Sequence, residues 1–229
     1  ESDREFVNAL NKLISQGMKG LIFDLRGNGG GALNASIRIL DQMFEENILL
    51  VYTQGLHREK RDYLSTRRGS FKKGKVVVLI DEFSASASEI VAGAVQDNDR
   101  GTVIGRRSFG KGLVQEQKDF KDGSAIRLTT ARYYTPLGRS IQREYGKGAE
   151  AYYNEFYDRI LSDYDLKTDT AKHDSIAFIT PSGKKVYGGG GITPDIIVEH
   201  NKMLIENKNL NLYFSQLFPF AFEFADKNR

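Results

Sequence analysis

The chain has 229 residues, with 33 Lys and Arg against 30 Asp and Glu, so its formal net charge at pH 7 is only +3. This near balance argues against a dedicated nucleic-acid binder, which usually carries a strongly basic face. The absence of cysteine excludes disulfides, thiolate metal sites and a cysteine nucleophile, and three widely spaced histidines argue against a zinc site or a Ser-His-Asp triad.

Helix and strand patterns alternate in the first hundred residues. The predicted elements are, in order, a helix over 6–16, a strand over 20–25, a helix over 33–45, strands over 48–53 and 75–80, and a helix ending near 96. Gly17 is placed to end the first helix. The polar stretch 57–75 is basic, which allows a phosphate-binding loop but favours a solvated hairpin. The element order predicts an α/β fold with a mainly parallel central sheet flanked by helices.

The pattern changes after Gly101. The predicted elements are strands over 102–105, 113–120 and 125–134, a helix over 150–161, and a hairpin of strands over 175–180 and 184–187. A run of four glycines then leads into residues 192–198. Residues 162–175 are polar and predicted to be a loop-like insertion. A cluster of five phenylalanines (Phe214, Phe218, Phe220, Phe222 and Phe224) follows. Such a cluster is typical of residues that pack on their own core or on a partner chain, which allows a homo-oligomer.

Two glycine-rich motifs suggest nucleotide binding and are incomplete. The turn Gly27-Asn28-Gly29-Gly30-Gly31-Ala32 fits the dinucleotide fingerprint, but the next strand ends Val51-Tyr52-Thr53-Gln54-Gly55, without the acidic residue that would bind the ribose. A tight turn, or backbone N–H groups that converge on an oxyanion, remain alternatives for this turn. The run Gly105 to Lys111 nearly forms a P-loop, but Gly112 replaces the metal-binding hydroxyl and a strand pattern follows.

A run of serines lies where a strand leads into a helix, at Ser84-Ala85-Ser86-Ala87-Ser88-Glu89. Ser86 and Glu89 have the spacing of a capping box, which would give Ser86 a structural role only. The same turn would also present Ser86 as a nucleophile, with the N–H of Ala87 facing an oxyanion. No histidine is suitably placed, so the base would have to be a lysine in a dry site. The two interpretations have about equal weight on the residues alone.

At these residues the sequence resembles the C-terminal processing (tail-specific) proteases, a family of Ser-Lys peptidases. The matching runs are Gly20 to Gly31, Ser84 to Glu89, Gly105 to Gln115, Thr130 to Pro136 and Gly191 to Asp195, in the family's order. The resemblance implies that Ser86 is the nucleophile, that Lys111 is the general base and that Gln115 orients the lysine. With it, we assign the oxyanion hole to the N–H groups of Ala87 and Gly30.

The resemblance also implies a ClpP/crotonase-like fold, protein or peptide substrates, no cofactor or metal, and export to the bacterial cell envelope. We expect one catalytic domain over 1–229, with the family motifs in about 20–198 and an aromatic extension over 199–229. This chain contains no PDZ domain, unlike most family members. It begins Glu1-Ser2-Asp3 without a signal peptide or initiator Met, so we expect an excised fragment whose targeting segment is missing. No apolar run approaches the ~18 residues of a membrane span.

The sequence therefore predicts a serine endopeptidase that cleaves proteins near their C-termini through an acyl-enzyme. Two alternatives remain open, namely a catalytically silent peptide-binding or scaffold protein of the same fold, and a nucleotide- or dinucleotide-binding protein.

Overall fold

The computed structural model describes residues 2–146, 148, 150–152, 154–156, 177–199, 220–221 and 223–227. The chain divides into two units, residues 1–197 and residues 198–229. In the second unit, residues 220–221 and 223–227 are helical, and the rings of Phe220 and Phe224 stack 6.1 Å apart. The expected insertion at 162–175 and the side chains of Phe214, Phe218 and Phe222 lie outside the described residues.

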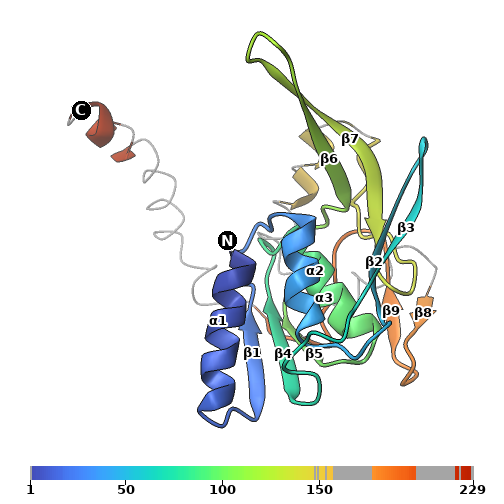
Figure 1. The fold of residues 1–229 in the computed structure, drawn as a ribbon. Coiled ribbons are helices and arrows are strands. Elements are labelled where there is room, and N and C mark those ends of the chain that lie inside the picture. The colour runs from blue at the N-terminus through green and yellow to red at the C-terminus, as the bar shows by residue number, and fades with distance from the viewer. Residues whose placement is uncertain are drawn as a thin grey trace. The chain divides into compact units, whose positions relative to one another are not determined.

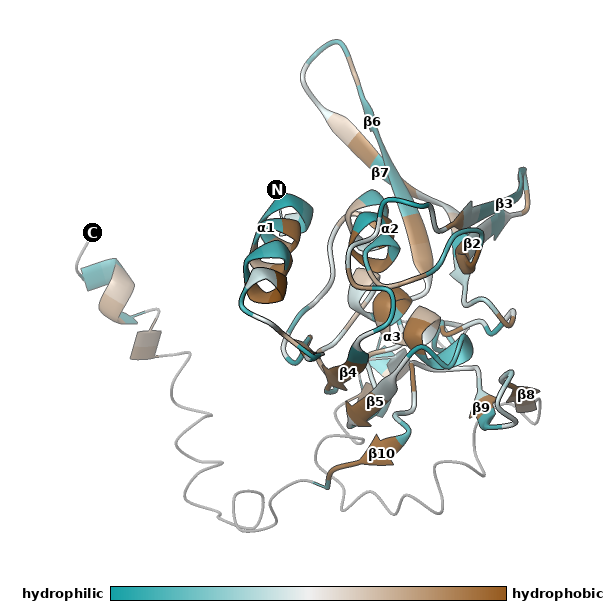
Figure 2. Cartoon of the chain, turned by 60° about the horizontal axis from the view of Figure 1, so that its bottom comes forward, coloured by the Kyte–Doolittle hydropathy of each residue, from teal (hydrophilic) through white to brown (hydrophobic). Residues whose placement is uncertain are grey.

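The first unit contains a four-stranded parallel sheet in the order β1-β4-β5-β10. Its strands are β1 (Gly20–Asp24), β4 (Lys75–Ile80), β5 (Thr102–Gly105) and β10 (Ile196–Ile197). β4 pairs directly with β1, so that Phe23 lies opposite Val78, and Val78 lies opposite Val103 of β5. β4 is strongly hydrophobic (Figure 2), as expected for a central parallel strand.

A second, antiparallel sheet has the order β3-β2-β7-β6. Its strands are β2 (Leu49–Gly55), β3 (Arg58–Leu64), β6 (Leu113–Asp119) and β7 (Ala125–Tyr134). The hairpin predicted for the basic stretch is confirmed, because β3 pairs with β2. β2 does not join the parallel sheet that the element order suggested, since its other neighbour is β7. The β6–β7 hairpin extends away from the helices (Figure 1), and β8 (Ala177–Ile179) and β9 (Lys185–Tyr187) form a separate hairpin.

This unit also contains the helices α1 (Ser2–Ser15), α2 (Leu33–Asp41) and α3 (Ala87–Asp97), and residues 150–152 and 154–156 are helical as well. α1 ends at Ser15, and Gly17 in the following turn has a φ of 84° and lets Met18 N–H donate to the Leu13 carbonyl oxygen at 3.1 Å. Every residue of α3 is buried, because this helix packs against β4 and β5 of one sheet and β2 of the other. The middle of α3, from Ile90 to Val95, is apolar on all sides, which is typical of a core helix, and here the helix connects the two sheets. No helix in the described part of the chain is long and apolar enough to cross a membrane.

Candidate active site

The turn between β4 and α3 holds Ser86 in a strained conformation. Ser86 precedes α3 as its N-cap residue, with φ 56° and ψ −113°. An ordinary capping serine has an extended backbone, and a positive φ is uncommon outside glycine. Strain of this kind persists only where the surroundings enforce it, and it is frequent at functional sites. The backbone geometry therefore marks Ser86 as more than a simple cap.

The other two serines of the cluster have structural partners. The Ser84 hydroxyl is buried and donates to the Leu25 carbonyl oxygen at 2.7 Å. The Ser88 hydroxyl lies 2.9 Å from the side-chain oxygen of Asn28 and 3.0 Å from the carbonyl oxygen of that residue. Both hydroxyls fasten α3 to the turn after β1, and Ser86 is the serine of the three whose hydroxyl is not tied to that turn.

Asp81 fixes the serine turn and the glycine turn to each other. Its carboxylate accepts from the Gly27 N–H at 2.9 and 3.0 Å and from the N–H groups of Phe83 and Ser84 at 3.0 and 3.1 Å. These bonds join two turns that are 54 residues apart in the sequence. The sequence analysis did not identify Asp81, although an acid directly after a buried strand is a signal that could have found it.

Gly30 lies against the turn that holds Ser86, with no room for a side chain. A Cβ there would lie 2.5 Å from the Ala85 carbonyl oxygen, 2.7 Å from Ala87 N and 2.9 Å from the Ser86 Cβ, and Gly30 has a φ of 97°. Its N–H donates to the Asn28 side-chain oxygen at 2.9 Å. The Ala87 N–H has no hydrogen-bond partner in the described part of the chain. Of the two N–H groups predicted for the oxyanion hole, that of Ala87 is available and that of Gly30 is engaged by Asn28.

Glu89 links Ser86 to the Lys111 segment. Its side chain is fully buried, and Oε2 accepts from the N–H groups of Ser86 at 2.7 Å and Lys111 at 2.9 Å. Oε1 accepts from the Gly110 N–H at 2.7 Å and the Ser108 hydroxyl at 2.6 Å. Burial raises the pKa of the Glu89 carboxyl, and the four hydrogen bonds act against that rise. The capping box is present, but the role of Glu89 across the chain was not predicted.

A second bridge joins the same two residues through Tyr133 of β7. Its hydroxyl lies 3.0 Å from the Ser86 carbonyl oxygen and also makes a hydrogen bond to the Lys111 carbonyl oxygen. The structure therefore brings Ser86 and Lys111 together through two shared partners, Glu89 and Tyr133.

Gln115 is placed differently. It lies on β6, opposite Thr129, and a register shift in the strand pair falls between Val114 and Gln115. The side chain is exposed, and it makes no hydrogen bond to Ser86, Lys111 or any other residue that the structure describes. The irregular strand breaks the simple alternation of faces. The predicted orienting contact between Gln115 and Lys111 is therefore not formed in this arrangement.

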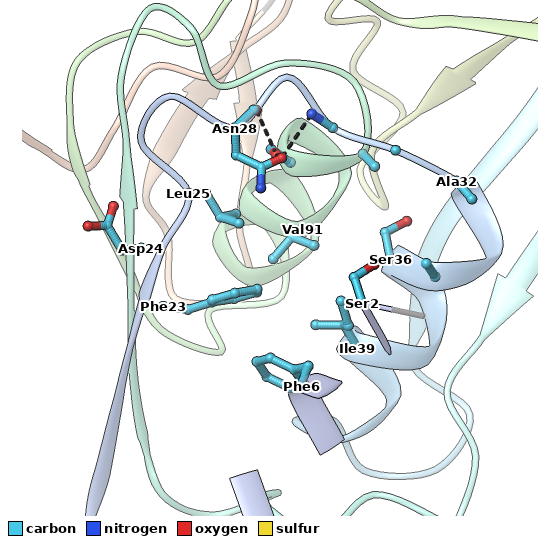
Figure 3. Close-up of a pocket in the computed structure, with 15 residues that line it drawn as sticks. Ser2, Phe6, Phe23, Asp24, Leu25, Asn28, Ala32, Ser36, Ile39 and Val91 are labelled. Atoms are coloured by element: carbon cyan, nitrogen blue, oxygen red, sulfur yellow. Dashed lines mark hydrogen bonds between the residues drawn. The ribbon is translucent and has the colours of Figure 1, made fainter. Parts of the chain in front are cut away.

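An apolar pocket of about 200 Å³ adjoins the two candidate oxyanion residues (Figure 3). Gly30 and Ala87 lie at its edge, together with Asn28. Its apolar lining comes from Phe6 of α1, Phe23 of β1, Leu25, Ile39 of α2 and Val91 of α3. Three helices and the end of β1 therefore form one pocket beside the turn that holds Ser86.

Neither nucleotide motif has the structural context it requires. Lys111 leads into strand β6 and not into a helix, as a P-loop would. β2, which should carry the ribose-binding acid of a dinucleotide fold, lies outside the parallel sheet.

Known proteins resemble this chain in sequence. The model of "Peptidase family S41" matches residues 1–150. The chloroplastic C-terminal processing peptidase of Tetradesmus obliquus is 39% identical over 138 residues, which cover 59% of this chain and 29% of the relative. The carboxyl-terminal-processing protease of Synechocystis sp. is 41% identical over 141 residues, which cover 61% of this chain and 32% of the relative. The chain thus spans about a third of the length of these relatives.

Solved structures give the same grouping. The photosystem II D1 C-terminal processing protease superposes with a TM-score of 0.54 and 37% identity, over 59% of this chain and 35% of that one. A lipoprotein from Streptococcus agalactiae superposes over 95% of this chain and 62% of its own, with a TM-score of 0.50 and 18% identity, and so shares the fold alone. The mixed α/β fold with its parallel sheet is common to these proteins. By its match to the family model and its identity to these relatives, the chain belongs to peptidase family S41.

Proposed function

We propose that this chain is the catalytic core of a serine endopeptidase that cleaves protein substrates near their C-termini, with Ser86 as nucleophile and Lys111 as general base. The likeness to the C-terminal processing peptidases supports the substrate class. A ClpP/crotonase-like arrangement of the fold and a location in the bacterial cell envelope belong to the same proposal, as the family resemblance of the sequence implies. Protein or peptide substrates are the only partners required, and no cofactor takes part.

One observation carries this proposal. A serine with strained backbone and a lysine 25 residues later share two buried partners, Glu89 and Tyr133. A structural cap needs neither the strain nor the link to Lys111. A nucleophile needs both, because the hydroxyl must be presented outward and the base must lie close to it.

The reaction then follows the usual course of acyl transfer. Ser86 Oγ attacks the scissile carbonyl carbon while Lys111 Nζ takes the hydroxyl proton. Lys111 returns that proton to the leaving amine as the C–N bond breaks, which leaves an ester on Ser86. Water attacks the ester, gives one proton to Lys111 and releases the new carboxyl terminus, and Lys111 returns the proton to Ser86.

The oxyanion of each tetrahedral intermediate would accept hydrogen bonds from Ala87 N–H and Gly30 N–H. The first is available in the structure. The second must leave Asn28 Oδ1, so binding of the substrate carbonyl exchanges one hydrogen bond for another. The adjoining apolar pocket supports an apolar residue next to the scissile bond.

The proposal is tested with a fluorophosphonate and fluorescein-labelled β-casein. We expect the phosphonate to modify Ser86, as mapped by mass spectrometry, and casein hydrolysis to stop in Ser86→Ala. Lys111→Ala and Lys111→Arg should be equally inactive, because a guanidinium does not release its proton in a protein. The orienting role of Gln115 requires its exposed side chain to turn toward Lys111 when substrate binds, and Gln115→Ala should then lower kcat and retain part of the activity.

The result also separates the alternatives. A folded protein that neither hydrolyses casein nor reacts at Ser86 would be a silent peptide-binding or scaffold protein. Near-normal turnover in Lys111→Arg would show that Lys111 is not the base. A rise in melting temperature on addition of ATP or NAD would instead indicate nucleotide binding.

A further inference from the structure

The hydroxyl of Tyr133 has two acceptors and one proton. It lies 3.0 Å from the Ser86 carbonyl oxygen and also makes a hydrogen bond to the Lys111 carbonyl oxygen. The Ser86 oxygen already accepts from the N–H groups of Glu89 at 2.9 Å and Ile90 at 3.0 Å. The Lys111 oxygen has no other donor in the described part of the chain. The Tyr133 hydroxyl therefore donates its proton in a hydrogen bond to the Lys111 main-chain carbonyl oxygen.

The Tyr133 hydroxyl stays protonated, and so remains a donor, at the pH of the reaction. Tyr133 is 2% exposed, and burial raises the pKa of its hydroxyl well above the usual value, with a contribution from the Glu89 carboxylate. A phenol that stays protonated can hold a carbonyl oxygen but does not act as a base. Tyr133 N–H also donates to the Gly112 carbonyl oxygen at 3.0 Å, so one residue holds two successive peptides of the lysine segment.

We propose that Tyr133 is a positioning residue that fixes the main chain of Lys111 at a set distance from Ser86. This inference rests on the function proposed above. The Lys111 peptide is held on its N–H side by Glu89 and on its carbonyl side by Tyr133.

The main chain of Lys111 needs these two restraints because the residues that flank it are flexible. Gly110, with a φ of 90°, and Gly112 flank Lys111, and glycine loses more conformational freedom on folding than any other residue. The lysine side chain adds four rotatable bonds. Without a fixed peptide the amine would lose its aim, and a displacement of about 1 Å in a reacting group can cost about 100-fold in rate.

Tyr133→Phe tests the proposal, with Tyr134→Phe as the matched control. Both variants remove one phenolic oxygen from adjacent residues of β7, and Tyr134 stacks on Tyr52 and not on the catalytic turn. The substrate is an internally quenched peptide built on the first cleavage site mapped in β-casein. We expect Tyr133→Phe to lower kcat by about 10- to 100-fold with little change in KM, and to slow fluorophosphonate labelling of Ser86 in parallel. Tyr134→Phe should leave all three values within twofold of wild type.

Rates are expressed per folded protein, with the folded fraction taken from circular dichroism at the assay temperature. A lower rate caused by unfolding is thereby separated from one caused by a misplaced Lys111 amine. A Tyr133→Phe enzyme with wild-type kcat and labelling rate would overturn the positioning role while leaving the Ser86–Lys111 proposal intact. A raised KM with unchanged kcat would overturn it as well. A wild-type protein without hydrolysis or labelling would overturn both.

Discussion

The Glu89 carboxylate is surrounded by donors that the fold supplies from two segments. Two of them belong to the Ser86 and Lys111 peptides, and two belong to Ser108 and Gly110. A buried carboxylate is costly unless it is hydrogen-bonded, and here the four donors offset the loss of water. The same group that satisfies the start of α3 therefore also determines where the lysine segment lies.

At this scale, the sequence analysis proposed Ser86 and Lys111 as the reacting residues, but it did not predict the side chains that hold their main chains. Ser86 and Lys111 belong to recognisable runs, whereas Glu89 was predicted only as a cap. Its partners Ser108 to Lys111 lie 19 to 22 residues further along the chain, and pairings over that distance leave no local pattern. Tyr133 was missed for the same reason.

The serine cluster gives a prediction at this scale. Ser86→Ala should abolish hydrolysis and remain folded, since loss of a cap costs about 1 kcal/mol. Ser84→Ala should retain activity below its melting point but lose about 1–3 kcal/mol of stability, because the Leu25 carbonyl oxygen loses its donor. Urea unfolding and casein hydrolysis measure the two effects. Equal loss of activity in both variants would contradict the assignment of Ser86.

Among the elements, the end of α2 shows how a distant segment overrides a local pattern. The sequence predicted a helix to residue 45, but α2 ends at Asp41. The Gln42 carbonyl oxygen accepts from the Phe71 N–H at 2.8 Å, and a Cβ on Gly69 would lie 2.1 Å from the Asp41 carbonyl oxygen. A loop nearly 30 residues later therefore packs onto the helix end. By contrast, the bounds of β4, β5 and β7 were predicted correctly, since their apolar patterns are bounded by local turn residues.

The glycine turn gives the prediction for this scale. Gly30→Ala should abolish hydrolysis and cost about 1–3 kcal/mol of stability, because its Cβ would meet the backbone of Ala85 and Ala87 and its φ is positive. Gly29→Ala is the control. No atom lies within 4 Å of a Cβ there, so stability should change by less than about 0.5 kcal/mol.

Melting curves and casein hydrolysis of the two glycine variants provide the measurement. If Gly30→Ala were as stable and active as Gly29→Ala, the close packing between the glycine turn and the nucleophile turn would not matter for function.

For the whole molecule, the α/β class and the parallel sheet were predictable, but the second sheet was not. The sequence showed its strands as separate hairpins, and their assembly depends on the pairing of β2 with β7, which brings Tyr52 opposite Tyr134 across 82 residues. Buried polar contacts then join the loop after β7 to α3. Arg139 and Asp97 form an ion pair with both side chains fully buried, and Arg139 also donates to Gln96.

Loss of the Arg139–Asp97 ion pair should lower the free energy of unfolding of the whole unit. Arg139→Met leaves the Asp97 charge buried without its partner and should cost about 3–5 kcal/mol. Arg58→Met removes an exposed pair with Glu116 and should cost less than about 1 kcal/mol. Chemical denaturation of both variants measures the difference, and similar midpoints would show that the buried pair does not stabilise the fold.

The complete burial of α3 determines how the protein exchanges its amide protons. Sheets lie on two sides of this helix, so its hydrogen bonds cannot open to water through a local fluctuation that leaves both sheets in place. Its amides should therefore exchange with deuterium only at the rate set by global unfolding, and so should those of the turn that Glu89 fastens to it. The proposed nucleophile, Ser86, would then lie at the start of the segment that we expect to open last.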